Sequence, residues 1–284
     1  MNMKLVRVGS RASPLARMQA ENVLSILRPI YPNIKFEIVP IITSGDKQKD
    51  APLISMERGV FVQEIESWLL KDKIDIAVHS AKDLTVTIPD GLSIVAVSKR
   101  QDPRDVQVNM FKTPLNKIPP GSRIGTSSPR RIAQLKALRP DLEIVNIRGN
   151  VGTRLDKVGT QEYDGVVLAA AGMLRMGRKL EIIEYFDHNR FTPEVGQGTL
   201  AAEYRTGDKQ IAQILESAIH LPTSISLIAE RAFLVTLGGG CNAPLGALAT
   251  TMGNKLNITS MAALPDGSLV FGYLSMTPPD GSFV

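Results

Sequence analysis

Charged side chains follow several predicted strands of the chain, at the points where those strands end. Lys82 and Asp83 come directly after one apolar segment, and Arg130 and Arg131 follow a Ser-Pro pair at the start of a predicted helix. Other arginines in such turns are Arg11, Arg148, Arg154 and Arg175. Ligands of open parallel sheets bind at the carboxyl ends of the strands, and arginine binds carboxylates through two parallel hydrogen bonds. The pattern therefore predicts a site for an anion that carries carboxylate groups.

Arg130 and Arg131 give the strongest of these signals. The positive end of a helix macrodipole makes cations unfavourable in the first turn. A bound anion would offset both charges, and the free N–H groups of the turn would help to hold it. We therefore expect an anion at this turn, with solvated surface arginines as the alternative.

Three further residues allow either a chemical or a structural role. Asp83 is a candidate proton donor, although an Asp after a strand is often a helix cap, and His79 is more often a hydrogen-bonded structural residue. Cys241 follows three glycines, which let the backbone approach a ligand closely. An accessible thiolate there can form a covalent bond, whereas a lone cysteine is commonly a small buried apolar residue.

Composition limits the possible functions. The chain has 284 residues, enough for two or three domains, and no apolar run long enough to span a membrane. The start of the sequence shows no signal-peptide core, and a single cysteine excludes an intramolecular disulfide, so we expect a cytoplasmic protein. The net charge of +5 favours an anionic partner, which can be nucleic acid, phosphate or a carboxylate. An aromatic content of 5% argues against single-stranded nucleic acid, whose binders stack bases on aromatic rings.

Strands and helices alternate over the first two-thirds of the chain. Helices are predicted to begin at Ser13-Pro14 and Ser128-Pro129, with a further helix around Ile65, and residues 47–57 are expected to form a mobile loop. Strands are predicted at residues 4–8, 36–42, 74–78, 123–125, 143–147 and 165–169. This alternation predicts parallel sheets with helices on both faces.

The chain also shows a repeat and a change of pattern. Val8-Gly9-Ser10 before Ser13-Pro14 resembles Ile124-Gly125-Thr126 before Ser128-Pro129, which indicates two similar α/β domains. From about Leu221 the pattern becomes one helix at 225–237, followed by strands at 245–250, 256–264 and 269–273. These segments predict a small α+β domain of mostly antiparallel strands.

Short blocks along the chain resemble the porphobilinogen deaminases. They lie at residues 9–16, 79–84, 125–131, 148–150, 153–155, 196–198 and 230–233, and at Gly239-Gly240-Cys241 with Pro244. The blocks occur in order, so the match is specific. The resemblance implies two doubly wound α/β domains like those of periplasmic binding proteins and a small C-terminal α+β domain. Domain 1 is expected at residues 1–98 and 199–216, domain 2 at 104–192 and domain 3 at 221–284.

The resemblance also implies an activity. Members of the family are transferases, the hydroxymethylbilane synthases of porphyrin and haem biosynthesis. They condense four porphobilinogen molecules into the linear tetrapyrrole hydroxymethylbilane and release four molecules of ammonia. A dipyrromethane cofactor, made from the substrate, serves as primer and is held by a thioether to Cys241. We accordingly expect a cytoplasmic monomer that binds porphobilinogen, with no metal, no nucleic acid and no membrane as partner.

Individual residues take roles from the same resemblance. Asp83, with Lys82, is catalytic, both as proton shuttle and as partner of the pyrrole N–H groups. The cofactor is attached to Cys241 and bound by Ser13, Lys82, Asp83, Thr126, Ser128, Arg130, Arg131, Arg148 and Gly149. The substrate is bound by Arg11, Ser13, Gln19, Arg148, Arg154, Arg175 and Gln197. Each pyrrole unit brings two carboxylates, which accounts for the number of arginines.

A few positions depart from the family pattern. Ala81 stands where a bulkier residue is usual, Thr85 replaces a proline, and Glu57-Arg58-Gly59-Val60 replaces Gly-Lys-Gly-Leu. The sequence also ends without the further helix of many members. Two rival hypotheses remain: a solute-binding protein of the periplasmic-binding-protein fold without catalysis, and a nucleic-acid-binding module. The Gly-Gly-Cys turn and the missing export signal argue against the first.

Overall fold

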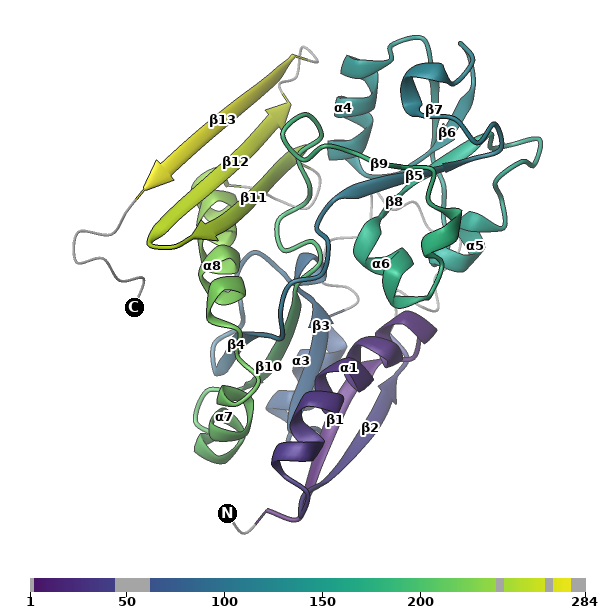
Figure 1. The fold of residues 1–284 in the computed structure, drawn as a ribbon. Coiled ribbons are helices and arrows are strands. Elements are labelled where there is room, and N and C mark those ends of the chain that lie inside the picture. Colours follow the sequence, from purple (N-terminus) through teal and green to yellow (C-terminus); the bar gives the residue numbers. More distant parts are fainter. Residues whose placement is uncertain (1–2, 44–61, 239–242, 264–267, 277–284) are drawn as a thin grey trace. The chain divides into compact units, whose positions relative to one another are not determined.

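The computed structural model describes residues 3–43, 62–238, 243–263 and 268–276 (Figure 1). The chain divides into two compact units, Met1–Gln101 with Thr199–Arg231, and Asp102–Gly198 with Ala232–Val284. Each unit contains a five-stranded sheet, and the second unit also contains a three-stranded sheet. The predicted loop at 47–57 and Cys241 lie outside the described residues.

The first unit is built on a sheet with the strand order β2-β1-β3-β10-β4. Its strands are β1 (Leu5–Arg11), β2 (Lys35–Ile41), β3 (Ile76–Ser80), β4 (Leu92–Val97) and β10 (Leu200–Arg205). β1 runs parallel to β2 and β3, whereas β10 runs antiparallel to β3 and β4. The parallel sheet predicted for this region is therefore a mixed sheet. Since β10 enters this sheet without a helical crossover from a neighbouring strand, nothing constrains it to run parallel.

Helices cover both faces of this sheet. They are α1 (Pro14–Ile30), α3 (Gln63–Leu70), α7 (Lys209–Glu216) and α8 (Leu221–Thr236). Ser13 caps α1, with its Oγ accepting from the N–H of Ala16 at 3.3 Å, and Pro14 holds the first helical position, as predicted. Buried residues of α1 and α7 form one apolar core with β1 and β3, and α3 forms another on the opposite face.

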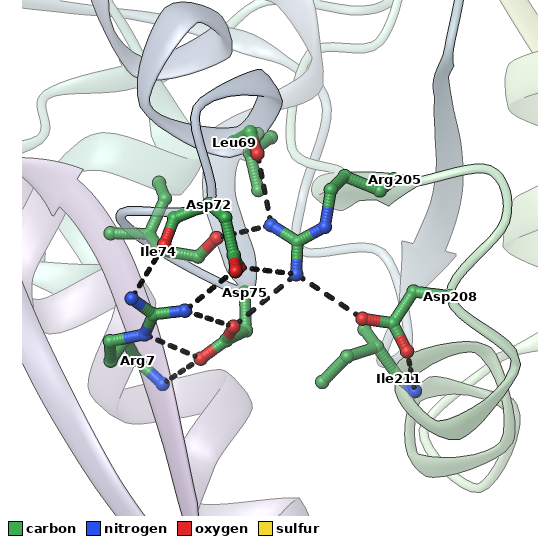
Figure 2. A network of polar contacts seen from close by, with 8 residues as sticks. All are labelled: Arg7, Leu69, Asp72, Ile74, Asp75, Arg205, Asp208 and Ile211. Carbon is green, nitrogen blue, oxygen red and sulfur yellow. Dashed lines mark hydrogen bonds and ion pairs between the residues drawn. The ribbon is translucent and has the colours of Figure 1, made fainter.

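A network of ion pairs joins the returning strand β10 to the rest of the first sheet (Figure 2). Asp75, just before β3, accepts hydrogen bonds from Arg7 of β1 at 2.7 and 3.0 Å. Arg205, at the end of β10, lies 3.3 Å from the same carboxylate and 3.2 Å from Asp208. Burial alone would raise the pKa of Asp75, but hydrogen bonds from Arg7 and Arg205 lower it. The carboxylate thus links β1 and β10, which lie far apart in the sequence.

The second unit repeats this topology. Its sheet has the order β7-β6-β8-β5-β9, with β6 parallel to β7 and β8, and β5 antiparallel to β8 and β9. The strands are β5 (Asp105–Asn109), β6 (Arg123–Gly125), β7 (Glu143–Val145), β8 (Gly165–Ala169) and β9 (Glu184–Tyr185). β5 takes the place that β10 has in the first sheet. The helices of this unit include α4 (Pro129–Leu138), α5 (Val151–Leu155) and α6 (Ala170–Arg175).

The remaining strands form the three-stranded sheet of the second unit. They are β11 (Leu245–Met252), β12 (Lys255–Ala263) and β13 (Leu269–Met276), and each pairs antiparallel with the next, as predicted. The fold class expected from the sequence is confirmed, with the correction that both large sheets are mixed. The residue bounds of the three domains stay a prediction. No helix within the described ranges is long and apolar enough to cross a membrane.

Candidate functional site

Lys82 and Asp83 lie in a 3-10 turn, Ala81–Asp83, that directly follows β3. Two backbone hydrogen bonds hold this turn, one from the Ala81 N–H to the Thr199 oxygen at 3.0 Å and one from the Leu84 N–H to the Ala81 oxygen at 3.4 Å. Ala81 and Leu84 are buried in one apolar cluster, whereas Lys82 is half-buried and Asp83 is exposed. The backbone hydrogen bonds and the apolar cluster thus fix the turn, while the Asp83 side chain is exposed to solvent.

Arg231 of α8 holds the segment that follows Asp83. Its guanidinium donates to the backbone oxygens of Thr85 and Val86 at 3.0 and 2.8 Å. Burial lowers the pKa of Arg231, and the nearby Glu203 carboxylate raises it. Arg231 was not predicted to have a role of its own, although a cation within an apolar helix is a visible signal in the sequence. Arg231 stabilises the chain next to the turn rather than contributing a charge to it.

The other predicted residues of the first unit lie around the end of β1. Arg11 is the last residue of that strand and is half-buried. Ser13 caps α1, so its oxygen is already engaged by the Ala16 N–H. Gln19 lies on the buried side of α1 with 6% of its surface exposed. Their predicted contacts with substrate or cofactor stay predictions.

Asp105, the first residue of β5, is the centre of the polar network in the second unit. Its carboxylate accepts from Arg130 Nη1 at 2.6 Å, from Arg131 Nη2 at 2.7 Å and Nε at 3.0 Å, and from Gln197 Nε2 at 3.0 Å. The Asp105 side chain is fully buried, and the side chains of Arg130 and Arg131 are only 3% and 6% exposed. Arg130 and Arg131 also donate to the backbone oxygens of Thr192 and Val167, respectively. Four hydrogen bonds therefore converge on one buried carboxylate.

This arrangement gives the first turn of α4 an internal counter-charge. The carboxylate of Asp105 offsets the charges of Arg130 and Arg131, and the binding of an anionic ligand by these two arginines stays a prediction. Burial alone would raise the pKa of Asp105, but the two guanidinium charges and the hydrogen bonds lower it well below its usual range. Asp105 was not predicted as a site residue, because its only signal in the sequence is an acidic residue at the start of an apolar segment.

Gln197 is the third side chain that hydrogen-bonds to the Asp105 carboxylate. Its amide donates to the Pro103 oxygen at 2.7 Å and to Asp105, and its side chain has no exposed surface. The structure therefore places Gln197 against Asp105. Its predicted role in binding substrate stays a prediction.

The turns after β6 and β7 hold the next group of predicted residues. Thr126 is buried, and its Oγ1 accepts from the Ser128 N–H at 3.3 Å, while Ser128 occupies the N-cap position of α4. Arg148 is half-buried. Gly149 has φ of +109°, and a Cβ built on it would lie 2.7 Å from the Thr153 side chain. Residues other than glycine rarely adopt this backbone conformation, and a Cβ would clash with Thr153. Only glycine therefore fits at this position of the turn.

Arg154 and Arg175 differ from the other arginines in their partners. Arg154 Nε donates to the Gly149 oxygen at 2.8 Å, and Arg175 Nη2 donates to the Gly198 oxygen at 2.7 Å. Burial lowers the pKa of each guanidinium to about 10, and the charge of Arg131 contributes to this for Arg154. Among the residues that the structure describes, no carboxylate lies within ion-pair distance of either group. A ligand carboxylate would supply the missing counter-charge.

Fold and site together define a class of protein. The two units carry related mixed sheets. The first presents an exposed carboxyl in the turn after β3, and the second presents half-buried guanidiniums on α5 and α6. Within the described ranges, no group of three or more His, Cys, Asp or Glu side chains is arranged to hold a metal ion. These features are those of an α/β protein that handles an anionic organic ligand.

Comparison with known proteins identifies the family. The model described as "Porphobilinogen deaminase, dipyromethane cofactor binding domain" matches residues 6–213, and "Porphobilinogen deaminase, C-terminal domain" matches residues 224–281. The porphobilinogen deaminase of Alkaliphilus metalliredigens is 45% identical over 269 residues, covering 94% of this chain and 85% of the relative. That of Bacillus subtilis is 42% identical over 272 residues, covering 95% and 87%. The chain belongs to the porphobilinogen deaminase family.

Family membership confirms the function expected from the sequence, which is action on porphobilinogen in porphyrin biosynthesis with a dipyrromethane cofactor. Solved structures with a similar fold include the methionine binding protein MetQ, 16% identical with a TM-score of 0.48, covering 84% of this chain and 97% of that one. A periplasmic substrate-binding protein from Coxiella burnetii is 14% identical with a TM-score of 0.46, covering 80% and 96%.

Proposed function

We propose that the chain is a hydroxymethylbilane synthase of the transferase class, in which Asp83 moves protons and the strand-end arginines bind the carboxylates of the pyrrole units. The proposed binding of carboxylates rests on the burial and the hydrogen-bond partners of Arg154 and Arg175. Both are half-buried cations whose described partners are only backbone carbonyl oxygens. Burying a cation without a counter-charge is unfavourable, so these positions favour an anionic ligand.

The residues present fit a dipyrromethane cofactor, whose rings carry acetate and propionate groups. Arg154 and Arg175 pair with no carboxylate among the described residues, so they offer guanidiniums to the acetate and propionate groups of pyrrole rings. When bound, the cofactor supplies a terminal pyrrole carbon that attacks the incoming substrate. Cys241 would hold it by a thioether, with contacts from Ser13, Lys82, Thr126, Ser128, Arg130, Arg131, Arg148 and Gly149.

Asp83 is proposed as the proton-transfer group. Loss of ammonia from the aminomethyl carbon of porphobilinogen breaks a C–N bond, and the leaving nitrogen must carry a proton. A carboxyl oxygen of Asp83 holds that proton before the bond breaks and accepts a hydrogen bond from the pyrrole N–H afterwards. The support for this role is that Asp83 is exposed on a turn whose backbone is fixed by the Ala81–Thr199 hydrogen bond. Lys82, its half-buried neighbour, would bind a substrate carboxylate.

The remaining parts of the proposal concern setting and partners. We infer that the protein acts as a monomer in the cytoplasm, with porphobilinogen as its partner and without nucleic acid or membrane. A net charge of +5 suits a substrate with two carboxylates as well as it suits a polyanion. The sequence blocks around Cys241 favour the catalytic function over simple solute binding.

Asp83→Asn tests the proposed role of the carboxyl. We expect kcat for porphobilinogen consumption to fall by about 10²–10⁴-fold, because the amide cannot transfer the proton. The intact mass should still show the cofactor, and the thermal unfolding midpoint should stay unchanged because the side chain is exposed. Asp90→Asn, an exposed position on the same connection, is the matched control and should keep full activity. Retention of most activity by Asp83→Asn would remove Asp83 from the mechanism.

A further inference from the structure

Three ionisable residues lie together in the interior of the first unit, beneath the turn that carries Asp83. They are Glu66 of α3, His79 of β3 and Glu203 of β10, with exposures of 4%, 6% and 0%. We refer to Glu66, His79 and Glu203 as the buried triad. The mechanism above uses none of them. Burying two carboxyl groups is costly unless they gain partners, so their presence here requires an explanation.

The register of the sheet brings His79 and Glu203 together. His79 is paired with Ala201 and Ala77 with Glu203, so the side chains of His79 and Glu203 are diagonal neighbours on the same face. Their Nε2 and Oε2 atoms are 3.1 Å apart. This contact links the last part of β3 to β10 through side chains, in addition to the backbone ladder.

One oxygen of the Glu66 carboxyl and one oxygen of the Glu203 carboxyl make no hydrogen bond within the described residues. Glu66 Oε1 and Glu203 Oε1 are buried and have no partner within the described part of the chain. The same elements, α3 and β3, contribute Ile65, Leu69 and Ala77 to an apolar cluster of this unit. Both carboxyl groups cannot be ionised here at low cost, since each would carry an unpartnered oxygen in an apolar interior.

Glu66 is the carboxyl that keeps its proton. Burial raises the pKa of Glu66 to about 7, and the charge of Glu203 adds to this, while His79 lowers it. Glu203 contacts the imidazole of His79 directly. The Glu66 carboxyl therefore exchanges its proton near neutral pH, within the protein core.

Few other charges face the triad from the elements packed around α3. Arg231 of α8 lies close enough to Glu203 for that carboxylate to raise its pKa. Glu230 of α8 is paired with Arg100, and β4 (Leu92–Val97) has no ionisable residue. On β1, Arg7 is paired with Asp72 and Asp75, and Arg11 ends the strand. Within the described part of the chain, the charges shown to act on Glu66 are those of Glu203 and His79, and Arg231 interacts with Glu203.

The triad is connected to the catalytic turn by short structural links. His79 is followed by Ser80, the end of β3, and then by Ala81–Asp83. On the partner strand, Thr199 precedes β10 and accepts the hydrogen bond from Ala81. Ala81 and Leu84 pack against Val62 of the α3 N-terminus and against Ala201 of β10. The same three elements, α3, β3 and β10, therefore carry the triad and fix the turn.

We propose that Glu66, His79 and Glu203 are positioning residues for Asp83, and that the single proton held by the triad keeps α3, β3 and β10 closely packed beneath the turn. Loss of this proton places a second negative charge beside Glu203, and repulsion between the carboxylates loosens the turn. Asp83 is then less well placed, and kcat falls while substrate binding does not change. This inference rests on the proposed role of Asp83.

Glu66→Gln tests the inference, because glutamine has the shape of a protonated glutamate and cannot ionise. The experiment measures kcat and KM for porphobilinogen with the holoenzyme from pH 5.5 to 9. We expect the ratio of kcat for Glu66→Gln to kcat for the wild type to be near one below pH 6. It should rise by about fivefold above pH 8, with KM unchanged. Glu216→Gln, an exposed position on α7, is the control and should give a constant ratio.

Urea unfolding of the same variants provides a second readout. Glu66 has a raised pKa in the folded state, so its contribution to stability is full below its unfolded pKa and is lost as pH rises through about 7. Glu66→Gln should therefore unfold at the same urea concentration as the wild type near pH 4, below the unfolded pKa of glutamate, and at a higher urea concentration than the wild type at pH 8.5. A kcat ratio that does not change with pH, or a change confined to KM, overturns the inference.

Asp83→Asn, measured alongside, separates the two proposals. Full activity of Asp83→Asn overturns the proposed function of Asp83, and the positioning role with it. If Asp83→Asn is inactive and the ratio of kcat for Glu66→Gln to kcat for the wild type does not change with pH, only the role of the triad is overturned. An inactive Asp83→Asn with the rising ratio supports both.

Discussion

Asp105→Asn is the substitution for which the structure gives the clearest magnitude. The carboxylate of Asp105 accepts hydrogen bonds from Arg130, Arg131 and Gln197 and has no exposed surface. An amide at this position keeps the shape but removes the charge that offsets two buried guanidiniums. Breaking a buried pair by removing one partner destabilises a protein by about 3–5 kcal/mol, so we expect a loss of that size.

Differential scanning calorimetry of the purified variants measures this loss. For a unit of this size, about 3–5 kcal/mol corresponds to a fall of roughly 6–20 °C in the midpoint of the affected transition. Asp102→Asn is the matched control, since Asp102 also pairs with an arginine, Arg104, but both side chains are partly exposed at 20% and 39%. Pairs of that kind contribute about 0–1 kcal/mol.

The pH dependence provides a further check on the same carboxylate. The pKa of Asp105 is lowered in the folded state, so its contribution is fully present above its unfolded pKa, about 3.9, and is lost as pH falls below that value. The difference in stability between wild type and Asp105→Asn should therefore be constant from pH 5 to 8 and narrow below about pH 4. If Asp105→Asn is no less stable than Asp102→Asn at pH 7, the assignment of Asp105 as the internal counter-charge is wrong.

Two other substitutions test the second unit. Gly149→Ala should destabilise the protein by about 1–3 kcal/mol, because φ is +109° and the new Cβ would meet Thr153. Gly121→Ala, at φ +76° with open space around it, should lower the thermal midpoint less, and equal losses would contradict the steric argument. Arg154→Gln and Arg175→Gln should each raise KM for porphobilinogen by about 10–100-fold, since a charge-assisted hydrogen bond contributes about 1.5–3 kcal/mol. Arg178→Gln, whose partner is Glu181, is the control, and an unchanged KM in both test variants would remove these arginines from the anion site.

Local sequence signals predicted the parts of the fold that depend on neighbouring residues. Ser13 with Pro14 was predicted to begin a helix and does cap α1, and the strand at Gly165–Ala169 has the predicted bounds. The antiparallel direction of β10 was not predicted, because strand direction depends on how the chain returns from a distant segment. Periodicity within a segment contains no information about that path.

The same limit applies to the site. The sequence identified Arg130 and Arg131 as unusual, because their position in the first turn of a helix is electrostatically unfavourable. It did not identify Asp105, whose carboxylate reaches them only after β5 joins the second sheet. Glu66 was missed for a related reason, since a glutamate on a short helix is usually exposed, and its burial depends on packing against β3 and β10. Partners that are distant in sequence become visible only in the folded chain.

The intact mass of the purified protein, recorded before and after addition of porphobilinogen, tests the central claim most directly. The account predicts a covalent adduct with the mass of two linked pyrroles, growing in steps of one pyrrole unit, and absent from Cys241→Ser. A chain that keeps the bare mass of its sequence in the presence of porphobilinogen, with no adduct at any time, would contradict the assignment of a cofactor-primed synthase.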